Sequence, residues 1–278
     1  MSKKHISAGT TQAYFGFIDS LGFLIGETTT APSSGSLQAM LRLLGIQTAA
    51  AGLPESEDVN IPGDDETLGT ITFAPDETPA FVANFGANDL DFNARVQVTS
   101  VETLGGIDLG VLQPNDPGSP NGTVIIQGKA VDKDAGTAGQ SMWSGQIFPL
   151  VTAAPLGRES FEGRSAGVYR IKITAQKASK KPWGVTIADG DLGTDGASII
   201  EFGADHPLLM DRITGNNSTD SFTLTKPLAA TDHLFVWDQT APLSHGSGVT
   251  GTVGSQTLAF DSAPAAGNKV IVLYGFQP

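Results

Sequence analysis

The sequence predicts a mainly β protein, with a large N-terminal block followed by a small C-terminal β-sandwich. Three observations predict this fold class. Gly and Pro account for 34 and 16 of the 278 residues, Thr, Val, Ile and Phe gather in short runs, and turn residues separate these runs at regular intervals. The length suits two domains, since single domains commonly have about 100 to 200 residues. We expect a domain over 1–200 and a β-module over 201–278, with the boundary near residues 197–205.

The first 45 residues predict an extended segment and then one helix. Two apolar runs between Tyr14 and Ile25 flank the sequence DSLG, a pattern typical of a hairpin or an extended arm. The next segment, SLQAMLRLLG, favours a short helix over 36–45, because Ser36 suits its N-cap and Gly45 its end. Its apolar residues recur at helical spacing, at Leu37, Met40, Leu41 and Leu44.

Strand candidates then follow in series and continue to the C-terminus. Those in the first block are AFVANF, FNARVQVTSV, GTVIIQGKAV, QIFPLVTAA, VYRIKITA and GVTI. Pro, Asn and Gly residues in LQPNDPGSPNG predict a protruding loop between two of them. The block after Ala204 contains about five more short strands, a spacing that suits a small sandwich.

Charge is distributed unevenly along the chain, whose formal net charge is -13. Residues 55–77 contain eight acids and no Lys or Arg. This composition fits a solvated loop with a short strand at TITF. The segment 158–181 instead gathers seven of the sixteen cations, set against two acids. These cations are Arg158, Arg164, Arg170, Lys172, Lys177, Lys180 and Lys181.

Three interpretations of the basic segment are open: a nucleic-acid site, a solvated face, or a charged subunit interface. The cations of a basic strand can contact successive phosphates of a nucleic-acid backbone, and Trp183 is suited to stacking on a base. The net negative charge opposes nonspecific binding to DNA, so we favour an interface. The residues expected there are Arg158, Arg164, Arg170, Lys172, Lys180 and Lys181, facing Asp64, Asp65 and Glu66 of a neighbouring subunit.

The sequence lacks the patterns that predict an enzyme, a cofactor site or a metal site. It has no dinucleotide-binding or phosphate-binding glycine motif, no HExxH and no GxSxG. Cysteine is absent, which excludes disulfides and thiolate chemistry. Asp189, Asp191 and Asp195 are compatible with a calcium loop or with an acidic Gly-rich linker. No run approaches the 18 apolar residues of a membrane-spanning helix, so we expect no membrane partner.

Two long stretches of the first block resemble major tail tube proteins of long-tailed bacteriophages. They are GTITFAPDETPAFVANFGANDLDFNARVQ and PLGRESFEGRSAGVYRIKITAQKASKKPWG. The second block resembles small β-modules appended to phage virion proteins, on the basis of NNSTDSFTLTKPL, HLFVWD and VGSQTLAFDSAPAAGNKVIVLYG.

The resemblance implies a tail-tube-type β-sandwich or barrel with one short helix, and a small outer β-sandwich module. It also implies subunits that join into hexameric rings, which stack into a tube through which DNA passes without tight binding. Residues 1–35 would form an N-terminal arm, and LQPNDPGSPNG or the acidic segment would contact the next ring. Partners would be other copies of the chain and other tail proteins, such as terminator and distal tail components. The protein would be made in the host cytoplasm and reside in the virion tail.

Two other functions remain open. A capsid cement or decoration protein would share this composition and the appended module. A glycan-binding protein of the tail surface is suggested by Trp237, His233 and His245, although a Trp within LFVW more often belongs to a core, and His233 more often to a strand end.

Overall fold

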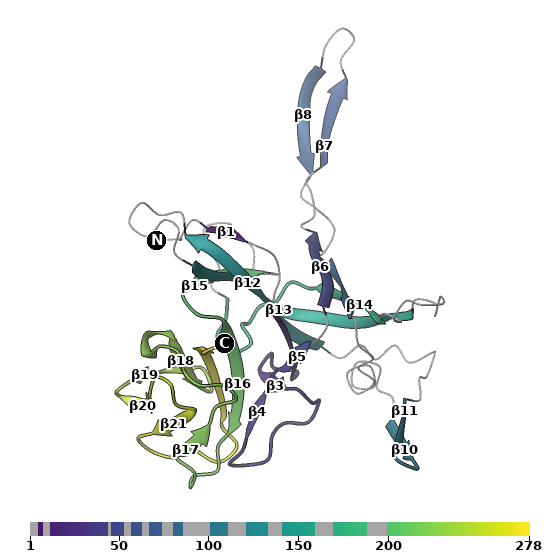
Figure 1. Cartoon of the computed structure of the whole chain (residues 1–278). Coiled ribbons are helices and arrows are strands. Elements are labelled where there is room, and N and C mark those ends of the chain that lie inside the picture. The colour runs from purple at the N-terminus through teal and green to yellow at the C-terminus, as the bar shows by residue number, and fades with distance from the viewer. Residues whose placement is uncertain are drawn as a thin grey trace.

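A computed structural model confirms a mainly β fold and describes eleven ranges of the chain. These are residues 5–7, 12–43, 46–52, 57–62, 67–73, 80–85, 101–110, 121–132, 141–158, 169–187 and 199–278. Within them the strands form a ten-stranded sheet, an eight-stranded sheet and two separate two-stranded ribbons (Figure 1). The described part of the chain contains no helix long and apolar enough to cross a membrane.

The ten-stranded sheet combines strands from most of the first block. Its main order is β3 (Leu24–Gly26), β2 (Gln12–Ile18), β12 (Asn121–Asp132), β13 (Ser141–Arg158), β14 (Tyr169–Ala175), β9 (Ala80–Phe85) and β6 (Ile46–Gly52). In addition, β1 (His5–Ser7) pairs with β12, β15 (Ile200–Ala204) with β13, and β5 (Leu41–Leu43) with β2. All these pairs are antiparallel, in line with the period-two alternation and turn residues of the sequence.

The eight-stranded sheet is formed mainly by the second block. Its order is β17 (Ser221–Thr223), β21 (Thr257–Phe260), β20 (Gly248–Gly251), β19 (Ala241–His245), β18 (Leu234–Asp238), β22 (Lys269–Gly275), β16 (Leu208–Thr214) and β4 (Leu37–Ala39). A single 3-10 turn, η1 (Thr231–His233), precedes β18. The last strand, β4, comes from the first block, so the strand pairing crosses the boundary expected near residue 200.

The core has two parts, one on each face of the ten-stranded sheet. Alternate residues of β2 and β12 face opposite ways, so Phe15 and Val124 belong to one cluster while Tyr14 and Ile125 belong to the other. The second of these clusters continues into the sandwich through residues such as Tyr274. The two sheets therefore share the cluster that contains Tyr14 and Ile125, while the other cluster belongs to the ten-stranded sheet.

Polar groups buried between the sheets also join them. The Gln127 side chain binds the backbone of Leu208 twice: its Nε2 donates to the carbonyl at 2.9 Å, and its Oε1 accepts from the N–H at 2.7 Å. The Gln127 side-chain amide thus makes the two hydrogen bonds that a neighbouring strand would make to Leu208, the first residue of β16. Nη1 of Arg212 donates to the Leu24 carbonyl at 2.8 Å. These bonds satisfy backbone groups that would otherwise be costly to bury.

The prediction of a helix over residues 36–45 is wrong. Residues 37–39 instead pair with β16, residues 41–43 pair with β2, and Met40 is buried between the two strands. A helix of three turns is marginal in water on its own, so two sets of sheet hydrogen bonds outweigh its local preference. Within the expected arm, residues 12–18 form the buried strand β2, because their aromatic side chains fill both parts of the core.

Candidate assembly surfaces

The ten-stranded sheet ends at β6, an edge strand without any charged residue. Its sequence is IQTAAAG, and it pairs antiparallel with β9. No other strand in the described ranges pairs with β6. Edge strands that must stay unpaired usually carry charges, proline or a covering element. The sequence of β6 contains no charge or proline that would oppose pairing with a further strand.

The acidic segment forms a two-stranded ribbon that projects from the sheets (Figure 1). In this ribbon, β7 (Glu57–Pro62) pairs antiparallel with β8 (Thr67–Phe73). Asp64, Asp65 and Glu66 connect the two strands and lie outside the described residues. A lone two-stranded hairpin is marginally stable in water, so the ribbon favours a partner.

The basic segment 158–181 spans the end of one hairpin and the loop that follows it. The register places three of the predicted cations on the part of β13 and β14 next to their connection, with Arg158 opposite Tyr169, Arg170 opposite Gly157, and Lys172 opposite Ala154. Arg164 lies outside the described residues. Lys180 and Lys181 lie beyond β14, where Lys180 forms an isolated bridge with Thr186. Pairing of this segment with the acidic segment of a neighbour stays a prediction.

The rings of Trp183 and Trp237 stack on each other, which covers one face of each ring. Their rings stack with centroids 4.8 Å apart and planes 16° apart, and Trp183 is only 7% exposed. Nζ of Lys181 lies 5.7 Å from the Trp183 ring centroid, on a cation–π contact. Base stacking on Trp183 and sugar stacking on Trp237 both require a free ring face. Within this stack, Trp183 covers one face of Trp237.

The turn between β2 and β3 carries a charge cluster that the sequence did not reveal. Oδ2 of Asp19 lies 2.6 Å from Nζ of Lys269 and 3.9 Å from Nη1 of Arg212, while its Oδ1 accepts the N–H groups of Leu21 and Phe23. Burial lowers the pKa of Arg212, and the nearby Asp19 carboxylate partly offsets this. Of the two alternatives for the segment around DSLG, a hairpin or an extended arm, the structure has the hairpin, and its acid fixes it to the second sheet.

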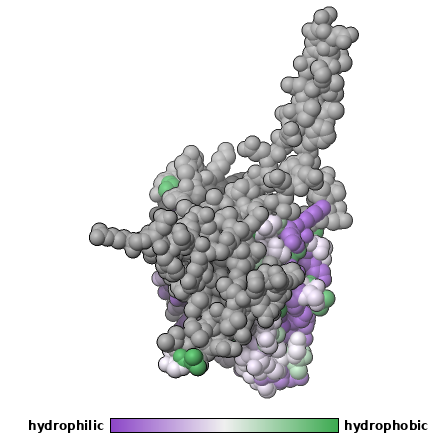
Figure 2. Space-filling view, turned by 90° about the vertical axis from the view of Figure 1, so that its right-hand side faces the viewer, coloured by the Kyte–Doolittle hydropathy of each residue, from purple (hydrophilic) through white to green (hydrophobic). Residues whose placement is uncertain are grey.

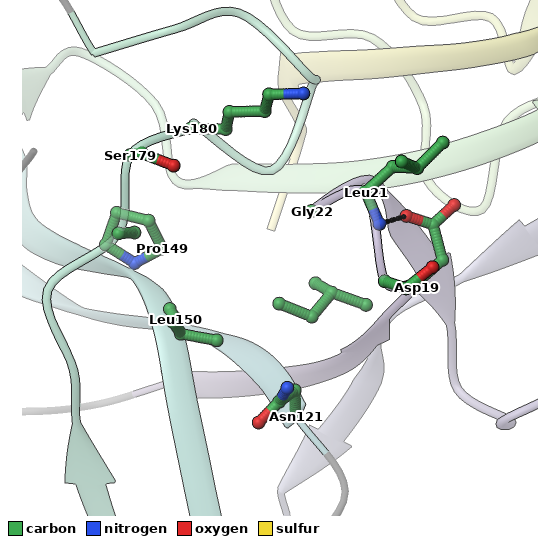
Figure 3. A pocket seen from close by; sticks show the side chains of 11 residues that line it. Asp19, Leu21, Gly22, Asn121, Pro149, Leu150, Ser179 and Lys180 are labelled. Atoms are coloured by element: carbon green, nitrogen blue, oxygen red, sulfur yellow. Dashed lines mark hydrogen bonds between the residues drawn. The ribbon is translucent and has the colours of Figure 1, made fainter.

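A pocket of about 260 Å³ opens beside this turn (Figure 3). Asp19, Leu21 and Gly22 lie on one side of it and Ser179 and Pro149 on the other, with Asn121 at its lower end in the view of Figure 3. Lys180 also lines it. The pocket therefore combines apolar groups with one cation and several small polar side chains.

In the described regions, no group of three or more His, Asp and Glu side chains gathers in a way that would hold a metal ion. The His206 and His233 rings lie edge to face at 5.7 Å, and Nε2 of His245 contacts the Gly251 carbonyl at 3.0 Å. His233 ends η1 directly before β18, at the strand end expected for it. Asp189, Asp191 and Asp195 lie outside the described residues.

The most buried acid, Asp211, has a structural role in the sandwich. Its carboxylate accepts the Thr225 N–H at 2.9 Å, the Thr225 hydroxyl at 2.9 Å and the Tyr274 hydroxyl at 3.0 Å. Burial raises the pKa of Asp211 to about 6, an effect that these hydrogen bonds oppose. Burial also raises the pKa of Tyr274. The network fixes the loop after β17 to the core.

A second projecting ribbon, formed by β10 (Val101–Leu104) and β11 (Ile107–Gly110), was not predicted as a site (Figure 1). Its tip residue Leu104 is 71% exposed. The sequence LGGI at its turn could have predicted this ribbon, since paired glycines between apolar residues favour a tight hairpin.

The described surface on the side of the molecule seen in Figure 2 has no extended apolar patch. Hydrophobic atoms form small separate groups there, and a hydrophilic band runs along one side of the described part (Figure 2).

No protein-family model matches the chain, and no similar sequence is found among curated proteins.

Proposed function

We propose that the protein is a virion structural subunit that self-assembles through its sheet edge into rings, and that stacked rings form the tail tube of a long-tailed phage. The observation that carries this proposal is the uncharged edge strand β6 at the end of a ten-stranded sheet. A neighbouring copy that adds a strand there would cover the open backbone groups.

The projecting ribbons support contacts beyond the sheet edge. A ring or a stack uses heterologous contacts, in which two different surfaces of the same chain are complementary. The β7–β8 ribbon and the basic segment supply opposite charge at separate places in the sequence. The net charge of -13 on each copy suits a conduit for DNA, because a negative wall repels phosphate.

Lysines on the β6 edge test the proposed ring contact. In the variant Ala49→Lys/Ala51→Lys, we expect the assembled fraction to fall at least tenfold, since strand addition would have to desolvate the new charges. Sedimentation velocity measures this fraction. The matched control is Ser221→Lys/Thr223→Lys, which places two lysines on β17, the edge strand of the other sheet, where both residues are exposed.

The control should assemble like the unchanged protein. Equal assembly of the β6 variant and the unchanged protein would reject β6 as the contact.

Charge reversal tests the pairing of the basic and acidic segments. We expect Arg164→Glu/Arg170→Glu to slow assembly at low salt while the subunit stays folded, because like charges would then face each other. Adding Asp64→Lys/Asp65→Lys to the same chain should restore part of the rate. Light scattering measures the rate and circular dichroism the folding. Absence of rescue would show that the cations contact something else.

A further inference from the structure

The ribbon formed by β10 and β11, which we call the finger, has an exposed apolar tip. Leu104 pairs with Ile107 at the end of the ribbon and is the most exposed large apolar residue among the described ones, at 71%. Cβ atoms built on Gly105 and Gly106 would meet nothing within 4 Å. A tip of this kind is costly to leave in water and gains from insertion into a pocket.

The charge of the finger narrows the kind of partner. Glu102 and Asp108 lie on its two strands, and residues 101–110 contain no Lys or Arg. Acidic residues beside an apolar tip disfavour an anionic lipid surface, which attracts basic segments. They favour an apolar pocket with a cation at its rim.

The pocket beside the β2–β3 turn has these properties. Ile18, Pro149 and Leu150 provide apolar lining, Leu21 is 55% exposed, and Lys180 supplies the cation. A volume of about 260 Å³ is several times the ~30 Å³ that a water molecule occupies, so a leucine tip would displace several waters. The wall residues that Figure 3 labels come from four parts of the chain: the β2–β3 turn, the start of β12, the middle of β13 and the loop after β14.

The one acid in the pocket lining does not oppose an acidic finger. The Asp19 carboxylate forms a 2.6 Å ion pair with Lys269 and accepts two backbone N–H groups, from Leu21 and Phe23. Its charge is therefore balanced within the subunit. Lys180 remains the cation of the lining that can face Glu102 or Asp108.

We propose that the finger of one copy inserts Leu104 into the Lys180 pocket of another copy. This inference rests on the proposed self-assembly and specifies a second contact, separate from the β6 edge. Finger and pocket are different surfaces of one chain, so the contact is heterologous and can repeat from subunit to subunit.

The absence of cysteine in the chain allows a direct test by disulfide crosslinking. One variant carries Leu104→Cys, and the other carries Ser179→Cys, at an exposed position of the pocket lining, with a tag that distinguishes its mass. The two full-length proteins are mixed at an assembling concentration and oxidised mildly. The control replaces Ser179→Cys with Val253→Cys, an exposed position (51%) outside the pocket lining.

We expect the mixed disulfide between positions 104 and 179 to form at least ten times faster than the one between 104 and 253. Equal rates, or no mixed disulfide, would overturn the inference. Electron microscopy of the same samples tests the proposed function separately. Rings or tubes with equal crosslinking rates would reject only the finger contact, whereas selective crosslinking without rings would support the contact and reject the tube.

Discussion

Replacement of Gly184 by alanine is expected to destabilise the protein by about 2 to 5 kcal/mol. Gly184 has a φ of +81°, which costs an alanine about 1 to 2 kcal/mol. The new Cβ would also clash with the Phe23 ring, which is 5% exposed, and overpacking of this kind costs about 1 to 3 kcal/mol. Phe23 has little room to move, since it bridges to Trp183 and contacts Lys269.

Gly267→Ala is the matched control for this change. Gly267 has the same φ of +81°, but its added Cβ would meet nothing within 4 Å. Gly267→Ala should therefore lower the free energy of unfolding only through the strained positive φ, by about 1 to 2 kcal/mol. Denaturant unfolding of the two variants under dispersed conditions measures the difference. Equal losses for both would mean that the β2–β3 turn does not pack tightly on the 178–187 loop.

Asp211 is expected to make the native protein more stable in mild acid than at neutral pH. Burial raises its pKa from the ordinary 3.8 to about 6, so between these values the native state binds a proton that the unfolded chain releases. The contribution of Asp211 to the free energy of unfolding therefore decreases as the pH rises from about 4 to about 6. The full effect is about 3 kcal/mol, since a tenfold change in proton affinity corresponds to about 1.4 kcal/mol.

Asp211→Asn should remove this pH dependence, because an amide does not titrate in the window. Unfolding free energies of both proteins at pH 4 and pH 7 give the test, with Asp220→Asn as a control for the loss of an exposed negative charge. We expect acidification to stabilise the unchanged protein relative to Asp211→Asn by up to about 3 kcal/mol. A difference that is the same at both pH values would contradict the assignment.

Local patterns predicted individual strands, but not which strands pair with each other. AFVANF corresponds to β9 and VYRIKITA contains β14, because each alternates between two faces of the ten-stranded sheet. Most of FNARVQVTSV lies outside the described residues. GVTI contains only an isolated bridge at Thr186.

Long-range pairing explains what the sequence did not reveal. Nothing near Leu37 indicates that β16, more than 160 residues later, is its partner. The helical spacing of SLQAMLRLLG therefore led to the prediction of a helix. The same holds for Asp19, whose cations Arg212 and Lys269 lie on two strands of the other sheet. The tryptophan pair 183 and 237 likewise forms only once both sheets are packed. Single-sequence patterns carry little information on such contacts.

Electron microscopy of the purified, unchanged protein at high concentration tests the proposed self-assembly most directly. We predict rings of uniform diameter or hollow tubes, which the Ala49→Lys/Ala51→Lys variant should not form and the Ser221→Lys/Thr223→Lys control should. Monodisperse single subunits at every concentration, confirmed by sedimentation velocity, would contradict the account.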